Sequence, residues 1–429
     1  MSDIKKIPCI FIPGFGQSKA YEILPDGSKK KVWPLNIDVK AAAKRIFPPY
    51  LKTVLARKDS GFTDTAYDMF CEVFEPFRAD EKGESVHNID ATGSDLPLSE
   101  YTENARGFVH KIAPVKYLSQ HIGEENLFCF SYNAFDCPCD TAAVLDAFIR
   151  GVKKRTQSEK VNLICYSMGG SVAAAYLSEY GEKNDVAKIL FISACLGGSA
   201  IQKSIISRDI DKNMGYSLLG FISGDKAVKT FKRVLSLTVW DVRYALLYRS
   251  LDAVQDTLLT TSPGMWAQLP VETSKEYEQK LIADEKYARL KEKVLKIRTV
   301  NENIPQILKD TQNSGTDIYI AAAYGSRIMP LCADGKINTD GILAVTSSAP
   351  GVTAADLGDK LKNGQRLSPD GQLDAENCLF PDRTWFFPQF VHGNIARSDE
   401  LSRLADGILY DGRITDVYSD ESLPQFSKT

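Results

Sequence analysis

The sequence has few histidines and little net charge, and it lacks long apolar runs. Only four of its 429 residues are histidine, and 52 basic residues stand against 55 acidic ones, a formal net charge of −3. This balance gives the chain as a whole no electrostatic attraction for nucleic acid, which is therefore not an expected partner. No stretch approaches the ~18 consecutive apolar residues that a transmembrane helix needs.

The cysteines do not form a disulfide pattern. Their number, nine, is odd, and their spacing is unlike that of a small secreted domain. The apolar stretch from Ile7 to Ile12 ends at once at Pro13, too early for the core of a signal peptide. We therefore expect a reduced, soluble, cytoplasmic protein. Cys137 and Cys139 have no histidine or second cysteine pair nearby, so we expect no metal site there and no cofactor.

The middle of the chain has the pattern of a parallel sheet. The composition, 44 % hydrophobic and 25 % charged, is that of a globular protein. A strand is predicted from Val161 to Cys165, a helix from Ser171 to Tyr180 and a second strand from Ala187 to Ser193. Both strands are apolar on both faces, which indicates a sheet covered by helices on each side.

This α/β core is interrupted twice. The first interruption has a less regular pattern, with a helix predicted from Val39 to Ile46, which Pro48 and Pro49 are expected to close. The second has helical periodicity almost throughout, and an apolar face from Tyr216 to Leu247 favours core covering over an interfacial lid. The predicted division is a core of 1–19, 107–199 and 316–415, an insertion of 20–106, a helical cap of 200–315 and a polar tail of 416–429.

A sharp turn between strand and helix holds the most informative serine. It reads Cys165-Tyr166-Ser167-Met168-Gly169-Gly170. A serine hydroxyl becomes a useful nucleophile when a tight turn presents it to a base and a substrate, and the residues two before and two after it must be small. Cys165 and Gly169 occupy those positions. The alternative is a turn with a structural role only, but the flanking strand and helix favour Ser167 as nucleophile.

An attacking serine also requires N–H donors for the oxyanion that develops on the substrate. One candidate is the backbone N–H of Met168, directly after the serine. The other is the backbone N–H of Phe15, in the glycine-containing loop 13–18 after the first strand. A nucleotide-binding loop is the weaker interpretation, because the third glycine of the dinucleotide fingerprint is missing and no phosphate-loop motif follows.

The base and the acid are sought after the serine, since that is their chain order where such an elbow occurs. Only His392 follows Ser167, so it is the candidate base. Two Asp-Gly pairs, at Asp334 and Asp340, supply candidates for the acid. The alternative for either pair is an ordinary surface turn. Asp340 is favoured because an apolar run from Ile342 to Val345 follows it and could hold the carboxylate inside.

Several motifs resemble the lecithin:cholesterol acyltransferase-like branch of the α/β-hydrolases. They are Ile12-Pro13-Gly14-Phe15-Gly16, Tyr166-Ser167-Met168-Gly169-Gly170, Leu196-Gly197-Gly198-Ser199, Ser262-Pro263-Gly264-Met265-Trp266 with Leu269-Pro270, and Thr339-Asp340-Gly341 with Ser347-Ser348. The resemblance implies an α/β-hydrolase fold with a mostly parallel central sheet flanked by helices. It also implies a helical cap over an acyl-chain pocket.

The same resemblance implies a catalytic triad of Ser167, Asp340 and His392 with an oxyanion hole from the backbone of Phe15 and Met168. The sequence departs from the family at Cys165, where the first elbow glycine is expected, and at Tyr132-Asn133-Ala134-Phe135, where Tyr-Asp-Trp-Arg is common. It also shows no signal peptide, although the lipoprotein-acting members are secreted.

Two classes of function follow. The first is a serine ester hydrolase (lipase or esterase) acting on lipid-like or small acyl esters, with transient contact at a membrane surface and no specific protein partner. O-acyl transfer by the same acyl-enzyme is its variant, because only the acceptor hydroxyl differs. The second is a catalytically silent hydrolase fold that serves as a binding protein, an interpretation that Cys165 at the elbow favours.

Overall fold

The computed structural model describes residues 6–35, 38–210, 236–329, 332–395 and 397–426. Its centre is a six-stranded sheet in the order β11-β8-β7-β6-β1-β5, in which every neighbouring pair is parallel. The strands are β1 (Cys9–Ile12), β5 (Leu127–Cys129), β6 (Val161–Tyr166), β7 (Val186–Ile192), β8 (Asp317–Tyr324) and β11 (Thr384–Pro388). All carboxyl ends therefore meet at one edge of the sheet.

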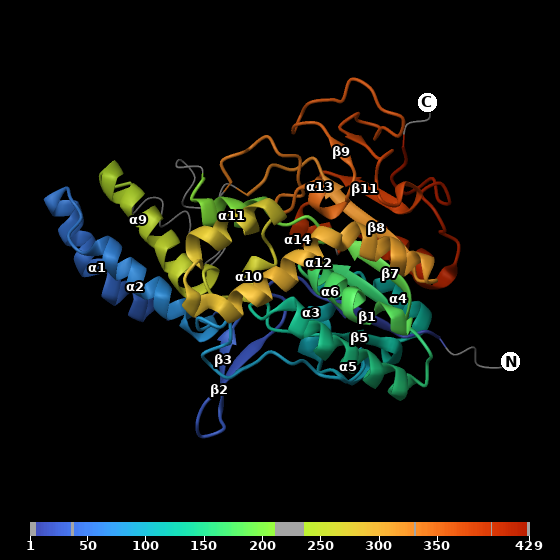
Figure 1. Cartoon of the computed structure of the whole chain (residues 1–429), viewed down its shortest axis with the longest axis horizontal. Coiled ribbons are helices and arrows are strands. Elements are labelled where there is room, and N and C mark those ends of the chain that lie inside the picture. Colours follow the sequence, from blue (N-terminus) through green and yellow to red (C-terminus); the bar gives the residue numbers. More distant parts are fainter. Residues whose placement is uncertain (1–5, 36–37, 211–235, 330–331, 396, 427–429) are drawn as a thin grey trace.

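Helices cover both faces of this sheet (Figure 1). One face packs against α5 (Pro138–Thr156), α6 (Gly169–Tyr180) and α12 (Ala288–Asn313). The opposite face packs against α3 (Glu103–Ile112), α4 (Lys116–Ile122) and α15 (Asp399–Asp406). Successive strand residues alternate between the two cores: Ile10 and Leu163 lie in the first, Phe11 and Ile164 in the second. The prediction of a parallel sheet flanked by helices is confirmed.

The first insertion begins with a small antiparallel sheet and continues as a helical hairpin. The sheet has the order β3-β2-β4. The elements of the insertion are β2 (Ala20–Ile23), β3 (Lys29–Trp33), α1 (Val39–Ala56), α2 (Phe62–Phe74), the 3-10 turns η1 (Glu75–Phe77) and η2 (Leu98–Glu100), and β4 (Ile89–Asp90).

The prediction that Pro48 and Pro49 end the first helix is wrong, because α1 continues to Ala56. The two prolines remove the hydrogen bonds that the carbonyls of Lys44 and Arg45 would accept. Both of these residues are exposed, so water can solvate the released carbonyl groups.

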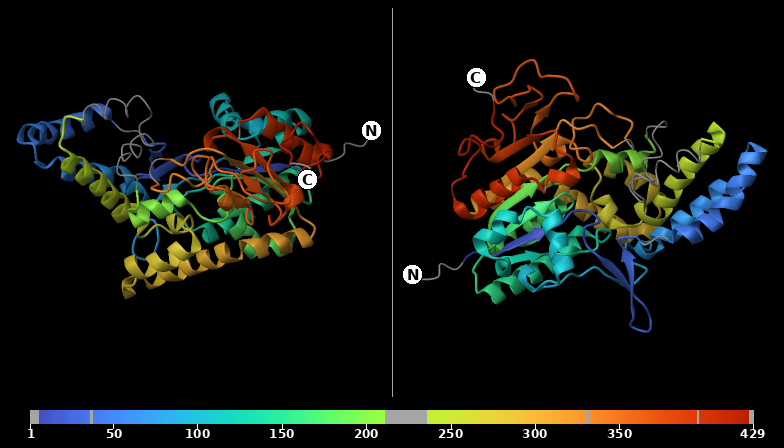
Figure 2. Two further views of the ribbon diagram at one scale, coloured as in Figure 1. Left: turned by 90° about the horizontal axis from the view of Figure 1, so that it is seen from above. Right: turned by 180° about the vertical axis from the view of Figure 1, so that it is seen from behind.

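The second insertion packs against the first. Its described elements before α12 are α7 (Ala200–Ser207), α9 (Trp240–Val254), the π-helical turn η5 (Gln255–Leu259), α10 (Pro263–Trp266), α11 (Val271–Leu281) and η6 (Glu285–Tyr287). Helix α9 lies against α2, and Val242 and Leu246 share a core with Tyr50 and Phe62. The helices α1, α2 and α9 thus form one arm, which extends away from the sheet in Figures 1 and 2.

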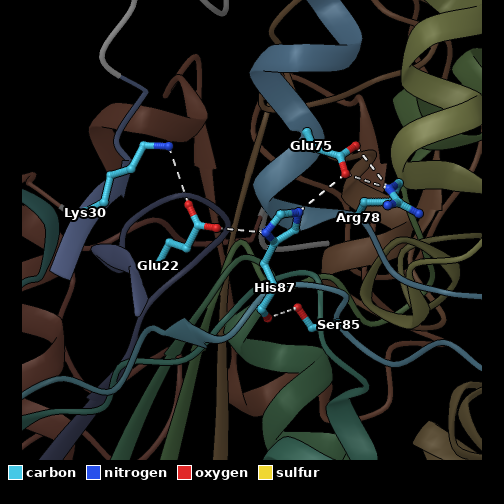
Figure 3. Close-up of polar contacts among 6 residues, drawn as sticks. All are labelled: Glu22, Lys30, Glu75, Arg78, Ser85 and His87. Atoms are coloured by element: carbon cyan, nitrogen blue, oxygen red, sulfur yellow. Dashed lines mark hydrogen bonds and ion pairs between the residues drawn. The ribbon is translucent and has the colours of Figure 1, made fainter. Parts of the chain in front are cut away.

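A histidine joins the small sheet to the arm (Figure 3). His87 Nδ1 lies 2.8 Å from Glu22 Oε1 of β2, and its Nε2 lies 3.4 Å from Glu75 Oε1 of η1. Glu75 also accepts from Arg78 Nε, and Lys30 pairs with Glu22. This polar bridge connects β2 and η1 through Glu22 and Glu75, which are 53 residues apart in the chain.

Helix α12 belongs to both parts of the molecule. Leu290 and Val294 lie in the core of the insertions, whereas Ile304 and Leu308 lie in the core beside the sheet. We therefore propose that the cap ends within α12 and not at residue 315. Residues 211–235, which include most of the predicted apolar face from Tyr216 to Leu247, lie outside the described residues.

The last third of the chain completes the carboxyl edge of the sheet. Its elements are α13 (Val345–Ser348), β9 (Thr353–Ala354), β10 (Leu373–Asp374), η7 (Pro381–Arg383), α14 (His392–Ile395) and the π-helical turn η8 (Gly407–Asp411); the 3-10 turns η3 (Glu124–Asn126) and η4 (Gly181–Lys183) lie earlier. In the predicted polar tail, Val417 and Leu423 are buried in the second core. Across the described ranges no helix has the length and apolar character to cross a membrane.

Candidate active site

The turn between β6 and α6 has the strained geometry that its sequence predicts. Ser167 has a φ of 53°, in the left-handed region that side-chain-bearing residues rarely adopt. A Cβ on Gly169 would lie 2.4 Å from the carbonyl oxygen of Ile12, and one on Gly170 would lie 2.6 Å from Cβ of Ala194. The two glycines therefore allow α6 to start close against β1 and the segment after β7, with the serine at the tip of the turn.

Cys165 fits the elbow without touching its chemistry. Its side chain is fully buried in the first core, on the face of β6 that packs against α5, α6 and α12. Burial raises the pKa of its thiol well above the ordinary value, so the group stays neutral. The small position before the serine is thus filled by an inert apolar residue.

The structure brings Ser167, His392 and Asp340 together. His392 Nε2 lies 2.9 Å from Ser167 Oγ, and His392 Nδ1 lies 2.6 Å from Asp340 Oδ2. With the proton on Nδ1, the imidazole donates to the carboxylate and accepts the serine hydroxyl proton at Nε2. The three residues come from the ends of β6, from the segment after β8 and from the start of α14, all at the carboxyl edge of the sheet.

Asp340 is held from several sides. It is fully buried, and its Oδ1 accepts from the backbone N–H groups of Ile342 (3.0 Å) and Leu343 (2.8 Å). Its carbonyl oxygen accepts from the backbone N–H of His392 at 2.7 Å. The competing candidate, Asp334, is exposed, and its carboxylate accepts from the backbone N–H of Lys336 in a local turn.

Tyr166 supports the histidine, a contact that sequence reasoning missed. Its ring stacks on the imidazole of His392 with centroids 5.1 Å apart, and its hydroxyl donates to the carbonyl oxygen of His392. Burial raises the pKa of this phenol, so it remains a donor. The only signal in the sequence was the place of Tyr166 next to Ser167. Side chains alternate between the two faces along a strand, so Tyr166 lies on the face of the sheet opposite to Cys165.

The loop after β1 is fixed next to the serine. Tyr132 Oη donates to the carbonyl of Pro13 at 2.8 Å, and Trp33 Nε1 donates to the carbonyl of Gly16 at 2.7 Å. Gly14 lies so close that a Cβ there would be 2.7 Å from Cβ of Ser167. Within the described ranges, the backbone N–H groups of Phe15 and Met168 have no hydrogen-bond acceptor, so both are available to a ligand.

An aromatic cavity adjoins this loop. Phe15 packs edge-to-face against Trp33 (6.0 Å between centroids) and Phe135 (5.5 Å), and Phe77 lies 4.6 Å from Phe135. The cavity is lined mostly by apolar groups: Gly14, Phe15, Gly16, Ser18, Ala20, Trp33, Phe77, Tyr132, Asn133, Ala134 and Phe135. Ser262 of the second insertion donates from its Oγ to the carbonyl of Phe135 at 2.8 Å, which ties this cavity residue to the insertion. The loop next to Ser167 thus contributes to a largely apolar, aromatic surface.

The remaining histidines lie elsewhere. His87 bridges Glu22 and Glu75, His110 contacts Glu124, and His121 contacts Asp406. Among the residues that the structure describes, no group of three or more His, Cys, Asp or Glu is arranged to hold a metal ion.

Comparisons with known proteins place the fold. Residues 104–315 match the family model described as "alpha/beta hydrolase fold". A search of the curated proteins found no match. Among solved structures, a phospholipase from Legionella pneumophila shares 12 % identity with a TM-score of 0.29. The match covers 52 % of this chain and 37 % of the phospholipase. This chain thus spans well under half of the phospholipase.

Two further solved structures are similar at the same level. A Bacillus licheniformis lipase shares 10 % identity with a TM-score of 0.34, covering 70 % of this chain and 88 % of the lipase. A carboxylesterase from the thaumarchaeon Nitrososphaera gargenis shares 13 % identity with a TM-score of 0.23, covering 50 % of this chain and 68 % of the esterase. Identity and TM-score are too low for these likenesses to bear on function. The family match and the parallel six-stranded sheet flanked by helices together show that the chain has the α/β-hydrolase fold.

Proposed function

We propose that this chain is a serine carboxylic-ester hydrolase with Ser167 as nucleophile, His392 as base and Asp340 as acid. The observation that carries the proposal is the pair of contacts at His392: 2.9 Å from Nε2 to Ser167 Oγ and 2.6 Å from Nδ1 to Asp340 Oδ2. A serine, an imidazole and a buried carboxylate in this order form an acyl-transfer relay.

In the acylation step, Ser167 Oγ attacks the ester carbonyl while His392 Nε2 takes the hydroxyl proton. Asp340 holds the imidazole with Nδ1–H toward the carboxylate and stabilises the imidazolium that forms. The tetrahedral oxyanion is bound by the backbone N–H groups of Phe15 and Met168. His392 then returns the proton to the departing alcohol. Water, activated by the same imidazole, hydrolyses the acyl-enzyme and restores Ser167.

The substrate class we propose is an ester with an apolar acyl group. The aromatic cavity beside Phe15, with Trp33 and Phe135 in its walls, supports this choice because its apolar surface next to the serine loop would favour a hydrocarbon group over a polar one. The motif resemblance to the lecithin:cholesterol acyltransferase-like branch supports it as well. Transfer of the acyl group to an alcohol uses the same acyl-enzyme and differs only in the acceptor. The cytoplasmic location expected from the sequence remains part of the proposal.

The test compares Ser167→Ala with Ser171→Ala, a buried serine one helical turn away whose Oγ donates to the carbonyl of Cys195 at 2.9 Å. We expect wild-type protein to release p-nitrophenol from p-nitrophenyl esters. Ser167→Ala should lose about 10⁴-fold or more in kcat/KM, since the nucleophile is gone. Ser171→Ala should stay within a few-fold of wild type. A series of acyl-chain lengths then defines the cavity's preference.

A fluorophosphonate probe separates the hydrolase from a silent binding protein. Covalent labelling at Ser167, absent in Ser167→Ala, requires an activated serine. Wild-type protein that neither reacts with the probe nor cleaves any ester of the series contradicts the proposal. Product analysis with an added long-chain alcohol distinguishes release of the free acid from formation of a new ester.

A further inference from the structure

The outward side of α1 carries an apolar stripe. Phe47, Leu51 and Leu55 are 57 %, 43 % and 76 % exposed. Their spacing of four residues places them on one side of the helix. Another side of α1 is turned into the arm, where Tyr50 is buried beside Phe62. The stripe therefore faces solvent, whereas another side of the same helix is packed inside the arm. Exposed apolar patches of this kind mark contact surfaces.

The same helix is basic. From 39 to 58 the chain has six basic residues and no acidic one, although the whole molecule has a net charge of −3. Lys40 and Lys44 are exposed and share the helix side of the apolar stripe, and Lys52 is exposed at its margin. Arg45 turns the other way, toward Glu72 of α2. The acidic residues of the arm lie on α2 and α9, where Asp64 and Asp252 both pair with Arg249 of α9.

A second exposed apolar group stands at the start of α9. Leu237, Val239 and Trp240 are 67 %, 37 % and 57 % exposed. The turn that follows them packs on the α1–α2 hairpin, since Val242 lies in the same small core as Tyr50. Apolar side chains are therefore exposed on two neighbouring helices of one arm.

We propose that the outer side of α1 docks the protein onto an anionic phospholipid bilayer. A helix with Lys side chains beside exposed Phe and Leu suits the boundary between headgroups and acyl chains, because the lysine stems reach the phosphates while the apolar groups enter the hydrocarbon. Nucleic acid would leave the stripe unburied, and pairing of α1 with α1 of a second copy would bring like charges together. Lipid satisfies both features.

The arm leaves the core at the carboxyl edge of the sheet, where Ser167 also lies (Figures 1 and 2). Docking through α1 would accordingly hold that edge near the bilayer. The docking proposal does not depend on the proposed ester hydrolysis, since it concerns residues outside the site.

The experiment measures co-sedimentation of the full chain with vesicles of phosphatidylcholine alone or mixed with phosphatidylserine. We expect binding only to the mixed vesicles, weakened by added salt. Lys40→Glu, Lys44→Glu and Lys52→Glu combined should lower this binding by about a hundredfold or more, since each basic residue near an anionic surface contributes roughly fivefold. Phe47→Gln, Leu51→Gln and Leu55→Gln combined should lower it by about tenfold or more.

Matched controls carry the same changes elsewhere on the surface. Lys111→Glu, Lys154→Glu and Lys309→Glu combined alter exposed lysines of α3, α5 and α12, and Val144→Gln with Leu295→Gln alters side chains that are 49 % and 54 % exposed. Both controls should bind like wild type. Circular dichroism and the thermal midpoint verify that every variant is folded.

Three results would overturn the docking proposal. The first is absence of binding to the mixed vesicles. The second is loss of binding in the controls to the same degree as in the α1 variants. The third is a wild-type dimer in light scattering that the Phe47, Leu51 and Leu55 variant converts to a monomer, which would assign the surface to a second copy. Failure of ester hydrolysis alone would leave vesicle binding unchanged.

Discussion

At the residue scale, two Asp-Gly pairs that are six residues apart have different surroundings. Asp340 is buried, accepts two backbone N–H groups and faces His392 Nδ1, whereas Asp334 caps an exposed turn. The backbone donors aim the carboxylate and leave Oδ2 for the imidazole. A buried carboxylate with these partners stabilises imidazolium, which an exposed turn residue cannot do.

We expect Asp340→Asn to lower kcat by about 10⁴-fold, because an amide in place of the carboxylate favours the wrong imidazole tautomer. Steady-state hydrolysis of a p-nitrophenyl ester measures the change. Asp334→Asn is the matched control and should leave kcat unaltered. Equal losses in both variants, or none in Asp340→Asn, would remove Asp340 from the relay.

At the element scale, the junction of β6 and α6 depends on how closely the helix approaches its neighbours. Gly169 begins α6 directly against the carbonyl oxygens of Ile12 and Pro13. Backbone atoms cannot move aside as a flexible side chain can. A methyl group there must displace either the helix or β1, and β1 leads into the loop that presents the Phe15 N–H.

Gly169→Ala should therefore lower the free energy of unfolding by about 1–3 kcal/mol, the usual cost of overpacking, and should also reduce ester hydrolysis. Gly151→Ala in α5 is the matched control, because a Cβ there meets nothing within 4 Å. It should raise stability by about 0.5–1 kcal/mol through helix propensity. Urea denaturation of both variants measures the two effects, and a Gly169→Ala protein as stable as wild type would contradict the close approach.

At the scale of the whole molecule, α12 connects two cores that are otherwise built from distant segments. Leu290, fully buried, packs with the insertions, and Leu308, also fully buried, packs beside the sheet. A continuous helix transmits the loss of either core to the other, because its hydrogen bonds extend through both. The insertions and the sheet are thus coupled in stability.

Leu290→Ala and Leu308→Ala should each cost about 2–5 kcal/mol by leaving a cavity, and each should shift one common unfolding transition. Calorimetry with circular dichroism and tryptophan fluorescence measures whether the transitions coincide. Separate transitions, with Leu290→Ala moving only the less stable one, would show that the two cores unfold independently.

Features that depend on neighbours along the chain could be predicted before the fold was known. Apolar strands followed by small-residue turns predicted the parallel sheet and the elbow at Ser167, since strand periodicity and glycine placement are local properties. The scarcity of histidine singled out His392. The end of the first strand at Ile12 also followed, because Pro13 and Gly14 interrupt the apolar run directly.

Features that depend on contacts between distant residues became visible only in the folded chain. Ser167 and His392 are 225 residues apart in the chain, and the apolar run that favoured Asp340 over Asp334 could not show its burial or its partners. The contact of Tyr166 with His392, the continuation of α1 through Pro48 and the packing of the two insertions into one arm have the same origin. Their free energy comes from non-local burial and solvation, which no local pattern records.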